Sequence, residues 1–593
     1  MRKIAICAMM IALLTGASYG VNYNFVGAQT VPDYDWDNVD IWDDGASGPG
    51  VIPWTSADVF TITGLLDASA DCLTLPTSDA TFGEINMDGG RLLGRFTTNI
   101  TYRVTNAGGK SGDVNLTGIN NMRWSDWSTA NTLRTWDIDG NFNFVKSVKS
   151  ARQFRKTGLV LRGDGKFVKC GATGLNYGFP SITLKSGASY DFQKDAWNDL
   201  YPVLNNSHGQ AGGVFTIETG ATATGGLDVR MGDTDEPLQI VGGGDITGLD
   251  VRLNHYKTTA DVGPLQVPGR TYGNLYFGVG AGGTSWESAR TARIMGGHLL
   301  VRGDLECPNL FKAGMEWILD TDNAGVVANV TVDGDFTLGG LNTTYGGCEA
   351  GLKANSSTID VGGDVILSGG VGTTKPKDMT YIPNMGGYIM GGTATIEIGG
   401  NYTVDCITAS KAKHDMGTST VTFDGNGTAA PQVIASKYYP FYNVTIDNPG
   451  GTVDLGSDPA DNLLVHGNFK VLAGTFDTQE RVLAFNGPAH ELYVAGGATG
   501  VFDNVELLAG SVVELGSDIT ITNLIMGAGS EIYLMGNTLW ADDLEYSGEG
   551  EWSNDGGTIY GAAGAAIPEP GTMLLLGTGV LGVIGFIRRR RMR

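Results

Sequence analysis

One short unit recurs along this chain and limits what it can fold into: a glycine, then aspartate or asparagine, then an apolar residue that begins an alternating run. The nine copies are Gly112-Asp113-Val114, Gly140-Asn141-Phe142, Gly244-Asp245-Ile246, Gly273-Asn274-Leu275, Gly303-Asp304-Leu305, Gly334-Asp335-Phe336, Gly363-Asp364-Val365, Gly400-Asn401-Tyr402 and Gly467-Asn468-Phe469. Glycine adopts positive φ without strain, and an Asp or Asn side chain bonds to its own nearby backbone. Each copy therefore predicts a sharp turn between two strands.

The runs on either side of these turns alternate apolar and polar residues. Examples are Val59-Phe60-Thr61-Ile62, Thr395-Ile396-Glu397-Ile398 and Val421-Thr422-Phe423. A period of two is typical of half-buried strands, whereas helical periodicity is almost absent between residues 21 and 566. The sequence therefore predicts an all-β body.

A longer echo indicates how the strands are arranged. Phe441-Tyr442-Asn443-Val444 returns as Phe502-Asp503-Asn504-Val505, an offset of 61 residues. Self-similarity at a fixed period predicts stacked repeats, each too small to bury its inward side chains alone. We expect residues 21–566 to form an elongated right-handed parallel β-helix, a solenoid. A string of antiparallel β-sandwiches is the alternative, and it predicts linkers between domains. No Pro/Ser-rich linker precedes residue 560.

The N-terminus has the three parts of a secretory signal peptide, in order. Arg2-Lys3 is a positive start, residues 4–14 are an apolar run too short to span a bilayer, and Ser18 and Gly20 supply the small residues of a cleavage site. We therefore expect residues 1–20 to direct secretion through the inner membrane. A buried N-terminal helix is the alternative.

The C-terminus, residues 567–593, also has three parts. A Pro568-Glu569-Pro570 motif precedes an apolar run at residues 571–587, and a basic cluster follows, formed by Arg588, Arg589, Arg590 and Arg591. Seventeen residues lie at the short end of the membrane-spanning range, so the run predicts a single C-terminal transmembrane helix. The four arginines predict that its end is cytoplasmic, which keeps the body outside the membrane.

This tail resembles the PEP-CTERM sorting signal of Gram-negative bacteria that make extracellular polysaccharide. The resemblance implies recognition by exosortase, a membrane protease-transpeptidase, at Pro568, Glu569 and Pro570. It also implies transient anchoring in the inner membrane, followed by release to the cell surface or biofilm matrix. A tail anchor that is never processed is the alternative.

The charge between the two targeting segments is strongly acidic. Residues 21–566 hold 32 of the 39 Lys and Arg residues and 62 of the 63 Asp and Glu residues, a formal charge of −30. This charge repels phosphates, and no basic stripe offsets it, so nucleic acid is excluded as a partner. The acidity favours divalent cations or cationic partners; the alternative is that it only keeps a secreted protein soluble.

One acidic segment has the spacing of a cation site. Asp33, Asp35, Asp37 and Asp44 stand where a calcium-binding EF-hand loop places oxygens at its positions 1, 3, 5 and 12. Asn38 replaces the usual glycine at position 6. These four aspartates are the candidate Ca²⁺ ligands, and no other cofactor is expected. The alternative is an alternating strand with its acids in water.

No catalytic constellation is apparent. The six histidines lack HxH or HExxH spacing, and the carboxylates form no identifiable catalytic pair. After the leader, Trp42, Gly45, Pro53 and the strand beginning at Asp58 resemble the first turns of autotransporter-like β-helix proteins. We therefore predict a non-enzymatic surface or matrix protein with a structural or adhesive role, and extracellular polysaccharide as a partner. The alternative is a β-helix lyase or glycosidase acting on matrix polysaccharide.

Overall fold

Parallel strands make up nearly all of the described structure. The computed structural model describes residues 22–25, 33–35, 42–43, 59–65, 72–74, 79–89, 91–94, 99–107, 110–117, 124–126, 134–145, 157–169, 179–193, 202–205, 213–231, 239–255, 265–277, 290–307, 316–339, 349–369, 386–405, 413–425, 430–546, 551–553 and 557–561. The chain divides into two units, Met1–Ala292 and Arg293–Arg593, and each is described by itself.

Most strands of the first unit fall into three parallel ladders. The first ladder contains β1 (Asn22–Phe25), β4 (Val59–Leu65), β7 (Glu84–Gly89), β10 (Val114–Thr117), β13 (Phe142–Val145), β15 (Asp164–Lys169), β17 (Ser189–Gln193), β18 (Val203–Asn205), β20 (Thr222–Met231), β22 (Asp245–His255), β24 (Thr271–Tyr272) and β25 (Leu275–Phe277), with β3 (Trp42–Asp43) antiparallel to β1. The second contains β6 (Ala80–Phe82), β9 (Ile100–Val104), β12 (Arg134–Ile138), β14 (Thr157–Leu161), β16 (Ser181–Leu184), β19 (Val214–Ile217) and β21 (Gln239–Val241). The third contains β2 (Asp33–Asp35), β5 (Cys72–Thr74), β8 (Arg91–Gly94) and β11 (Trp124–Asp126).

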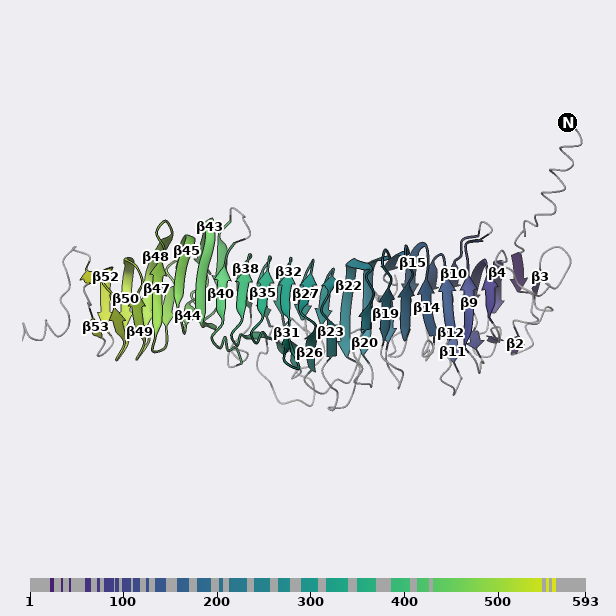
Figure 1. Ribbon diagram of the computed structural model, residues 1–593, viewed down its shortest axis with the longest axis horizontal. Coiled ribbons are helices and arrows are strands. Elements are labelled where there is room, and N and C mark those ends of the chain that lie inside the picture. The colour runs from purple at the N-terminus through teal and green to yellow at the C-terminus, as the bar shows by residue number, and fades with distance from the viewer. Residues whose placement is uncertain are drawn as a thin grey trace, which may run out of the picture. The chain divides into compact units, whose positions relative to one another are not determined.

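Apart from β3, neighbouring strands of a ladder are parallel, and other strands lie between them in the sequence. In the first ladder Val114 faces Phe142, and Phe142 faces Phe167, steps of 28 and 25 residues. Between two such strands the chain forms one strand of the second ladder: β12 lies between β10 and β13 in the sequence, and β14 lies between β13 and β15 (Figure 1). Parallel strands need such crossovers, because a two-residue hairpin joins only antiparallel neighbours.

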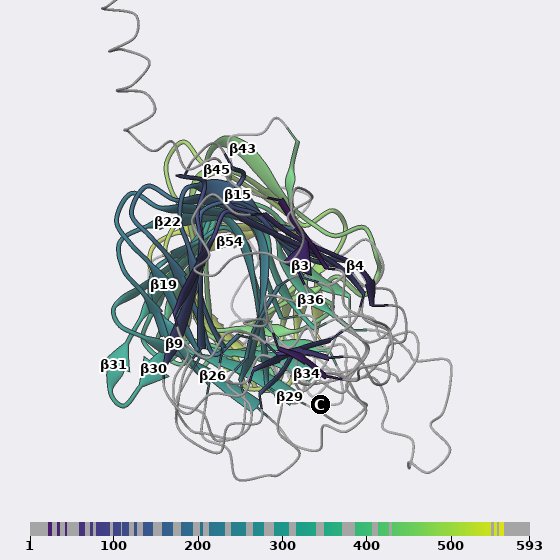
Figure 2. The same ribbon diagram turned by 90° about the vertical axis from the view of Figure 1, so that its right-hand side faces the viewer.

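Phenylalanines stacked in register form the core of the first unit. The rings of Phe142, Phe167 and Phe192 lie 5.4 and 5.3 Å apart, and all three are fully buried. Phe192 on β17 also contacts Phe215 on β19, with ring centres 6.0 Å apart. The first and second ladders therefore share one apolar interior, and Figure 2 shows β15 and β19 on different sides of it.

The second unit repeats this arrangement. Its first ladders are β27 (His298–Val301), β32 (Asn329–Val332), β35 (Thr358–Val361), β38 (Thr395–Ile398), β40 (Thr420–Phe423) and β43 (Asn443–Leu455), and beside them β28 (Leu305–Cys307), β33 (Phe336–Leu338), β36 (Val365–Ser368), β39 (Tyr402–Asp405) and β41 (Gln432–Ala435). Two further ladders continue toward the C-terminus: β42 (Pro440–Phe441), β44 (Leu463–Val465), β46 (Val482–Phe485), β48 (Thr499–Leu507), β50 (Ile519–Met526), β52 (Thr538–Tyr546) and β54 (Thr558–Tyr560), and β45 (Phe469–Asp477), β47 (His490–Val494), β49 (Val512–Leu515), β51 (Glu531–Tyr533) and β53 (Glu551–Ser553). The remaining strands of the second unit are β29 (Glu316–Asp320), β34 (Glu349–Lys353) and β37 (Gly387–Met390), and the antiparallel pair β30 (Asp322–Asn323) and β31 (Val326–Val327). Of the other two strands, β23 (Leu265–Pro268) lies in the first unit, and β26 (Arg290–Met295) begins in the first unit and ends in the second.

Inward positions of the second unit stay apolar from strand to strand. Val330, Ile359, Ile396, Val421 and Val444 face one another in turn across five strands, and all are buried. The predicted all-β body with period-two strands is confirmed, because the three example runs fall in β4, β38 and β40. No α-helix occurs in the ranges that the structure describes, and the predicted C-terminal helix lies outside them.

At Phe441 the 61-residue sequence echo does not match a whole number of ladder steps. Phe441 faces Val465, which faces Phe485, which faces Leu507, so three steps cover 66 residues. Phe502, the echo of Phe441, faces Ile521 instead. At Leu463 the same offset is three ladder steps, because Leu463 faces Leu483, Leu483 faces Val505, and Val505 faces Leu524. The echo therefore follows the register of the strands at Leu463 but not at Phe441.

Candidate functional site

The Gly-Asx units form the corners between consecutive strands. Gly334-Asp335 joins β32 to β33, and Gly363-Asp364 joins β35 to β36. We call each such dipeptide a corner. Corners of successive strands lie on top of one another, because the amide of Gly363 donates to the carbonyl of Gly334 at 3.0 Å. The predicted order of strand, turn and strand is confirmed here.

At four of these corners the aspartate side chain bonds to the next corner along the stack. The carboxylate of Asp304 accepts from the amide of Asp335 at 3.0 Å, that of Asp335 from Asp364 at 2.8 Å, and that of Asp364 from Asn401 at 2.7 Å. The same bond links the amide of Asn141 to Asp113 at 2.6 Å. The prediction that these side chains bond their own local backbone is therefore wrong at these four corners, but it is confirmed at Gly244-Asp245, where Oδ1 of Asp245 accepts from the amide of Thr247 at 2.8 Å. The bonds at the four corners instead tie one strand layer to the next.

The corner glycines are required for space. A Cβ at Gly363 would lie 2.6 Å from the carbonyl oxygen of Gly334, and closer still to Oδ1 of Asp335. Positive φ, the reason predicted from the sequence, applies at Gly112 but not at Gly334, Gly363 or Gly400. A side chain there would occupy the place of the Asx group that arrives from the preceding corner.

Removing one Asx acceptor should cost stability only when the oxygen itself is lost. Asp335→Ala leaves the amide of Asp364 without its acceptor, and we expect a loss of about 1–2 kcal/mol in the free energy of unfolding. Asp335→Asn keeps an oxygen at that position and should change stability by less than about 0.5 kcal/mol. Urea unfolding measures both variants. Equal losses in the two would contradict this role of the oxygen.

In two of these stacks the last corner contains asparagine, and the next strand of the ladder places a buried polar side chain opposite the corner glycine. After Gly400-Asn401 the residue opposite Gly400 is Gln432, whose Nε2 donates to the carbonyls of Gly400 and, at 2.7 Å, of Ile398. After Gly467-Asn468 the residue opposite Gly467 is His490, whose Nδ1 lies 2.7 Å from the Gly467 carbonyl. No corner glycine lies opposite Gly400 or Gly467, and the side chains of Gln432 and His490 contact the carbonyl oxygens of these two glycines instead. We call these side chains caps.

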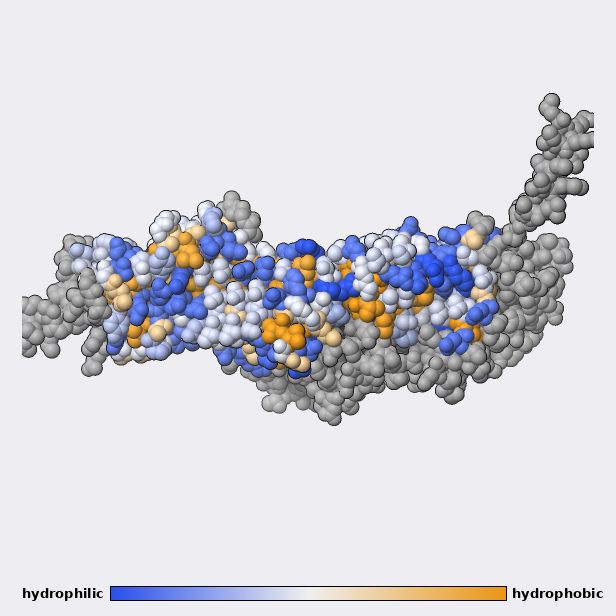
Figure 3. Space-filling model, in the orientation of Figure 1, coloured by the Kyte–Doolittle hydropathy of each residue, from blue (hydrophilic) through white to orange (hydrophobic). Residues whose placement is uncertain are grey.

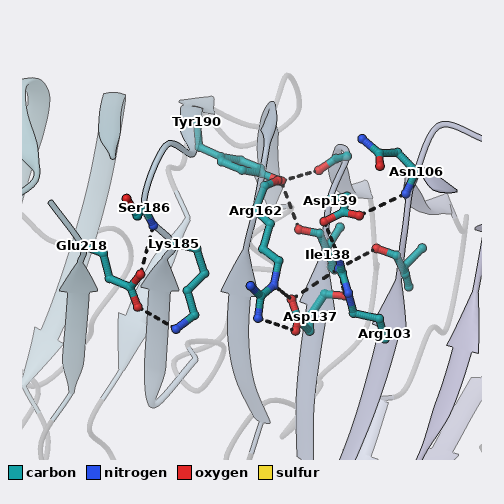
Figure 4. Close-up of polar contacts among 12 residues, drawn as sticks. Arg103, Asn106, Asp137, Ile138, Asp139, Arg162, Lys185, Ser186, Tyr190 and Glu218 are labelled. Atoms are coloured by element: carbon teal, nitrogen blue, oxygen red, sulfur yellow. Dashed lines mark hydrogen bonds and ion pairs between the residues drawn. The ribbon is translucent and has the colours of Figure 1, made fainter. Parts of the chain in front are cut away.

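A third stack ends in the same way, one strand later. Opposite Gly140 lies Gly165, which leaves room for Tyr190 of the following strand to reach past it. The Tyr190 hydroxyl lies 2.7 Å from the carbonyl oxygen of Gly140 and 2.9 Å from that of Arg162 (Figure 4). None of the three caps was predicted from the sequence. Two of them could have been, because Gln432 and His490 are polar residues at inward positions of strands that alternate apolar and polar residues.

Beside Tyr190, charged side chains of the second ladder pair with one another (Figure 4). Arg162 donates to both oxygens of Asp137, at 2.7 and 3.0 Å, while Arg103 contacts Asp137 at 3.4 Å and donates to Asp139. Burial opposes ionisation of Asp139, but hydrogen bonds led by that from Arg103 outweigh it and hold its pKa below the usual value. Because arginines neutralise these carboxylates, the ion pairs are better suited to holding neighbouring strands together than to transferring protons.

A second group of carboxylates has the opposite electrostatics. Asp360 on β35 faces Glu397 on β38, and Asp424 follows β40. Burial, then the charges of Asp360 and Asp424, raise the pKa of Glu397; burial, then Asp360 and Asp447, raise that of Asp424. Even so, no group of three or more His, Cys, Asp or Glu side chains within the described ranges is placed to hold one metal ion.

The residues predicted as sites lie mostly beyond what the structure describes. Asp33 and Asp35 belong to β2, which runs parallel to β5, while Asp37 and Asp44 fall outside the described residues, so the calcium site stays a prediction. Pro568, Glu569, Pro570 and the arginines at 588–591 also fall outside them. In the part of the chain with described coordinates, no helix has the length and hydropathy needed to cross a membrane.

Comparison with known proteins identifies the tail. Neither the curated proteins nor the solved structures contain a significant match to this chain. Residues 566–591, however, match the family model described as the PEP-CTERM protein-sorting motif, which covers the Pro-Glu-Pro sequence, the apolar run and the four arginines. This match supports the chain being a secreted, exosortase-sorted surface protein.

Proposed function

We propose that this chain is a structural or adhesive protein of the cell surface or extracellular matrix, delivered there by exosortase. The observation that carries the proposal is the sorting motif at residues 566–591, placed after a long acidic β body. We further propose that the body is a right-handed parallel β-helix. Parallel ladders that advance by about one circuit per strand, from 19 residues between Val512 and Glu531 to 39 between Asp33 and Cys72, support this fold.

The way the chain uses its polar groups supports a structural role. The Asx side chains of the corners bond from one strand layer to the next, and the carboxylates beside Tyr190 pair with arginines. We propose that the chain is not an enzyme. Turnover of the host's polysaccharide by the purified chain would contradict this, and Glu397, with its raised pKa, would be the first residue to test as the acid.

An exposed aromatic pair supports polysaccharide as the partner. Trp540 on β52 is 40% exposed and faces Tyr560 on β54, with the two rings stacked at 6.1 Å. Aromatic faces of this kind offer apolar contact area together with a polar edge. The surface in Figure 3 is otherwise a mixture of hydrophilic residues and small separate apolar patches. Ca²⁺ bound by Asp33, Asp35, Asp37 and Asp44 remains part of the proposal.

Changing the sorting motif should hold the protein in the inner membrane. We expect replacement of Pro568, Glu569 and Pro570 together by alanine to abolish release, because the apolar run and the arginines would still anchor the chain. Cell fractionation, followed by immunoblotting of the inner-membrane and surface fractions, measures this. Asp542→Asn, an exposed change on β52, is the matched control and should be sorted normally.

Normal surface delivery of the triple variant would contradict exosortase sorting. Retention of both the triple variant and the Asp542→Asn control would point to a general export defect, which would also remove support for the motif. Retention of the triple variant alone supports the proposal.

A further inference from the structure

The two caps Gln432 and His490 occupy equivalent places and differ in one chemical respect. Each lies opposite the glycine of the last corner in its stack, Gly400 for Gln432 and Gly467 for His490. Both are almost fully buried, with exposed fractions of 5% and 3%. Glutamine keeps the same protonation state at all physiological pH values, whereas histidine titrates between pH 5 and 8.

His490 contacts carbonyl oxygens with both ring nitrogens. Nδ1 lies 2.7 Å from the oxygen of Gly467, and Nε2 lies 2.9 Å from that of Gly487. A neutral imidazole has one N–H and can donate to only one of the two, while an imidazolium can donate to both but carries a charge into the interior. Which form is stable depends on whether hydrogen bonds to the two carbonyls offset the cost of burying the charge of the imidazolium.

The surroundings of His490 favour the neutral form. The ring of Phe485 on β46 packs 5.4 Å away, Val513 on β49 faces His490, and the next residue, Glu491, is paired with Lys470 of β45 at 2.6 Å. His490 interacts electrostatically with His466, which is also cationic when protonated, so a charge on one ring disfavours a charge on the other.

The pKa values of the two histidines fall accordingly. Burial lowers the pKa of His490 below 6.5, and the two carbonyl contacts only partly oppose it. Burial, and then His490, lower the pKa of His466 as well, against a smaller opposing effect of Asp415.

We propose that His490 is an acid-sensitive catch built into the stack: the neutral ring closes the corner after Gly467-Asn468, and protonation opens β46 and β47 locally. Because the closed state binds the proton more weakly than the open state, closure is fully present above about pH 6.5 and weakens as the pH falls below it. Gln432 closes the equivalent corner at any pH. The protein thus has one corner that responds to acid and one that does not.

Hydrogen exchange of the full chain, followed by mass spectrometry from pH 7.5 to pH 5 and corrected for intrinsic exchange rates, tests the catch. We expect peptides covering residues 482–494 to open more at pH 5, by at most about 30-fold, the ratio for 1.5 pH units below 6.5. Peptides covering 432–435 should not change. In His490→Gln the acid response should vanish, whereas His466→Asn should keep most of it.

The reciprocal variant keeps the test decisive if His490→Gln folds poorly. Gln432→His should give residues 432–435 an acid response that they otherwise lack. Unchanged or increased protection of residues 482–494 at pH 5 would overturn the proposal, because the two carbonyls would then stabilise the imidazolium. An acid response that persists in His490→Gln would overturn it as well, by assigning the effect to other groups.

Discussion

Gly363→Ala is expected to lower the free energy of unfolding by about 3 kcal/mol, near the upper end for overpacking. The new methyl group would lie 2.6 Å from the backbone of Gly334 and would displace the Asp335 carboxylate from the amide of Asp364. The strain and the lost hydrogen bond act together, because relieving the first requires the corners to separate and break the second. Urea unfolding of the purified chain measures the loss.

Gly297→Ala is the matched control for this substitution. Gly297 also lies in the second unit, has no positive φ, and has no atom within 4 Å of the position that a Cβ would take. Alanine there should change stability by less than about 0.5 kcal/mol. If Gly363→Ala were as stable as Gly297→Ala, close approach would not be the reason for glycine at the corners.

Phe167→Ala is expected to cost about 4 kcal/mol in the first unit. Phe167 is fully buried, and its ring contacts Phe142, Phe192 and Phe179 at centroid distances of 5.4, 5.3 and 5.7 Å. Its removal leaves a cavity between two strand layers that neighbouring rings, fixed in register, cannot easily fill. Urea or thermal unfolding measures the change.

Lys166→Ala serves as the control on the same strand. Lys166 is exposed. The hydrogen bond that its backbone amide donates to Oδ1 of Asn141 does not involve the side chain and is kept in the variant. A change of less than about 0.5 kcal/mol is expected. A loss as large as that of Phe167→Ala would mean that β15 does not bury alternate residues as described.

Sequence patterns could predict the strands and corners because both depend on local chemistry. The alternation in Thr395-Ile396-Glu397-Ile398 determines which side chains face inward, and the burial pattern of β38 follows it. The Gly-Asx pairs could likewise be located. Their purpose could not be worked out in the same way, because the acceptor Oδ1 of Asp335 and the amide of Asp364 are 29 residues apart in the chain.

The caps were beyond local patterns for the same reason. Gln432 is understood only once Ile434 is known to face Tyr402, which places Gln432 opposite Gly400. Loop lengths between strands vary, so the register cannot be counted from the sequence, and the 61-residue echo of Phe441 at Phe502 misplaces it. Long-range pairing, and not residue chemistry, is what the sequence leaves open.

The most direct test of the functional account is the intact mass of the protein isolated from the cell surface. Exosortase sorting predicts a chain that has lost the residues after about Pro570, including the apolar run at residues 571–587 and the arginines that follow it. Surface material that still ends at Arg593 would contradict that account and would indicate a protein anchored by an unprocessed tail.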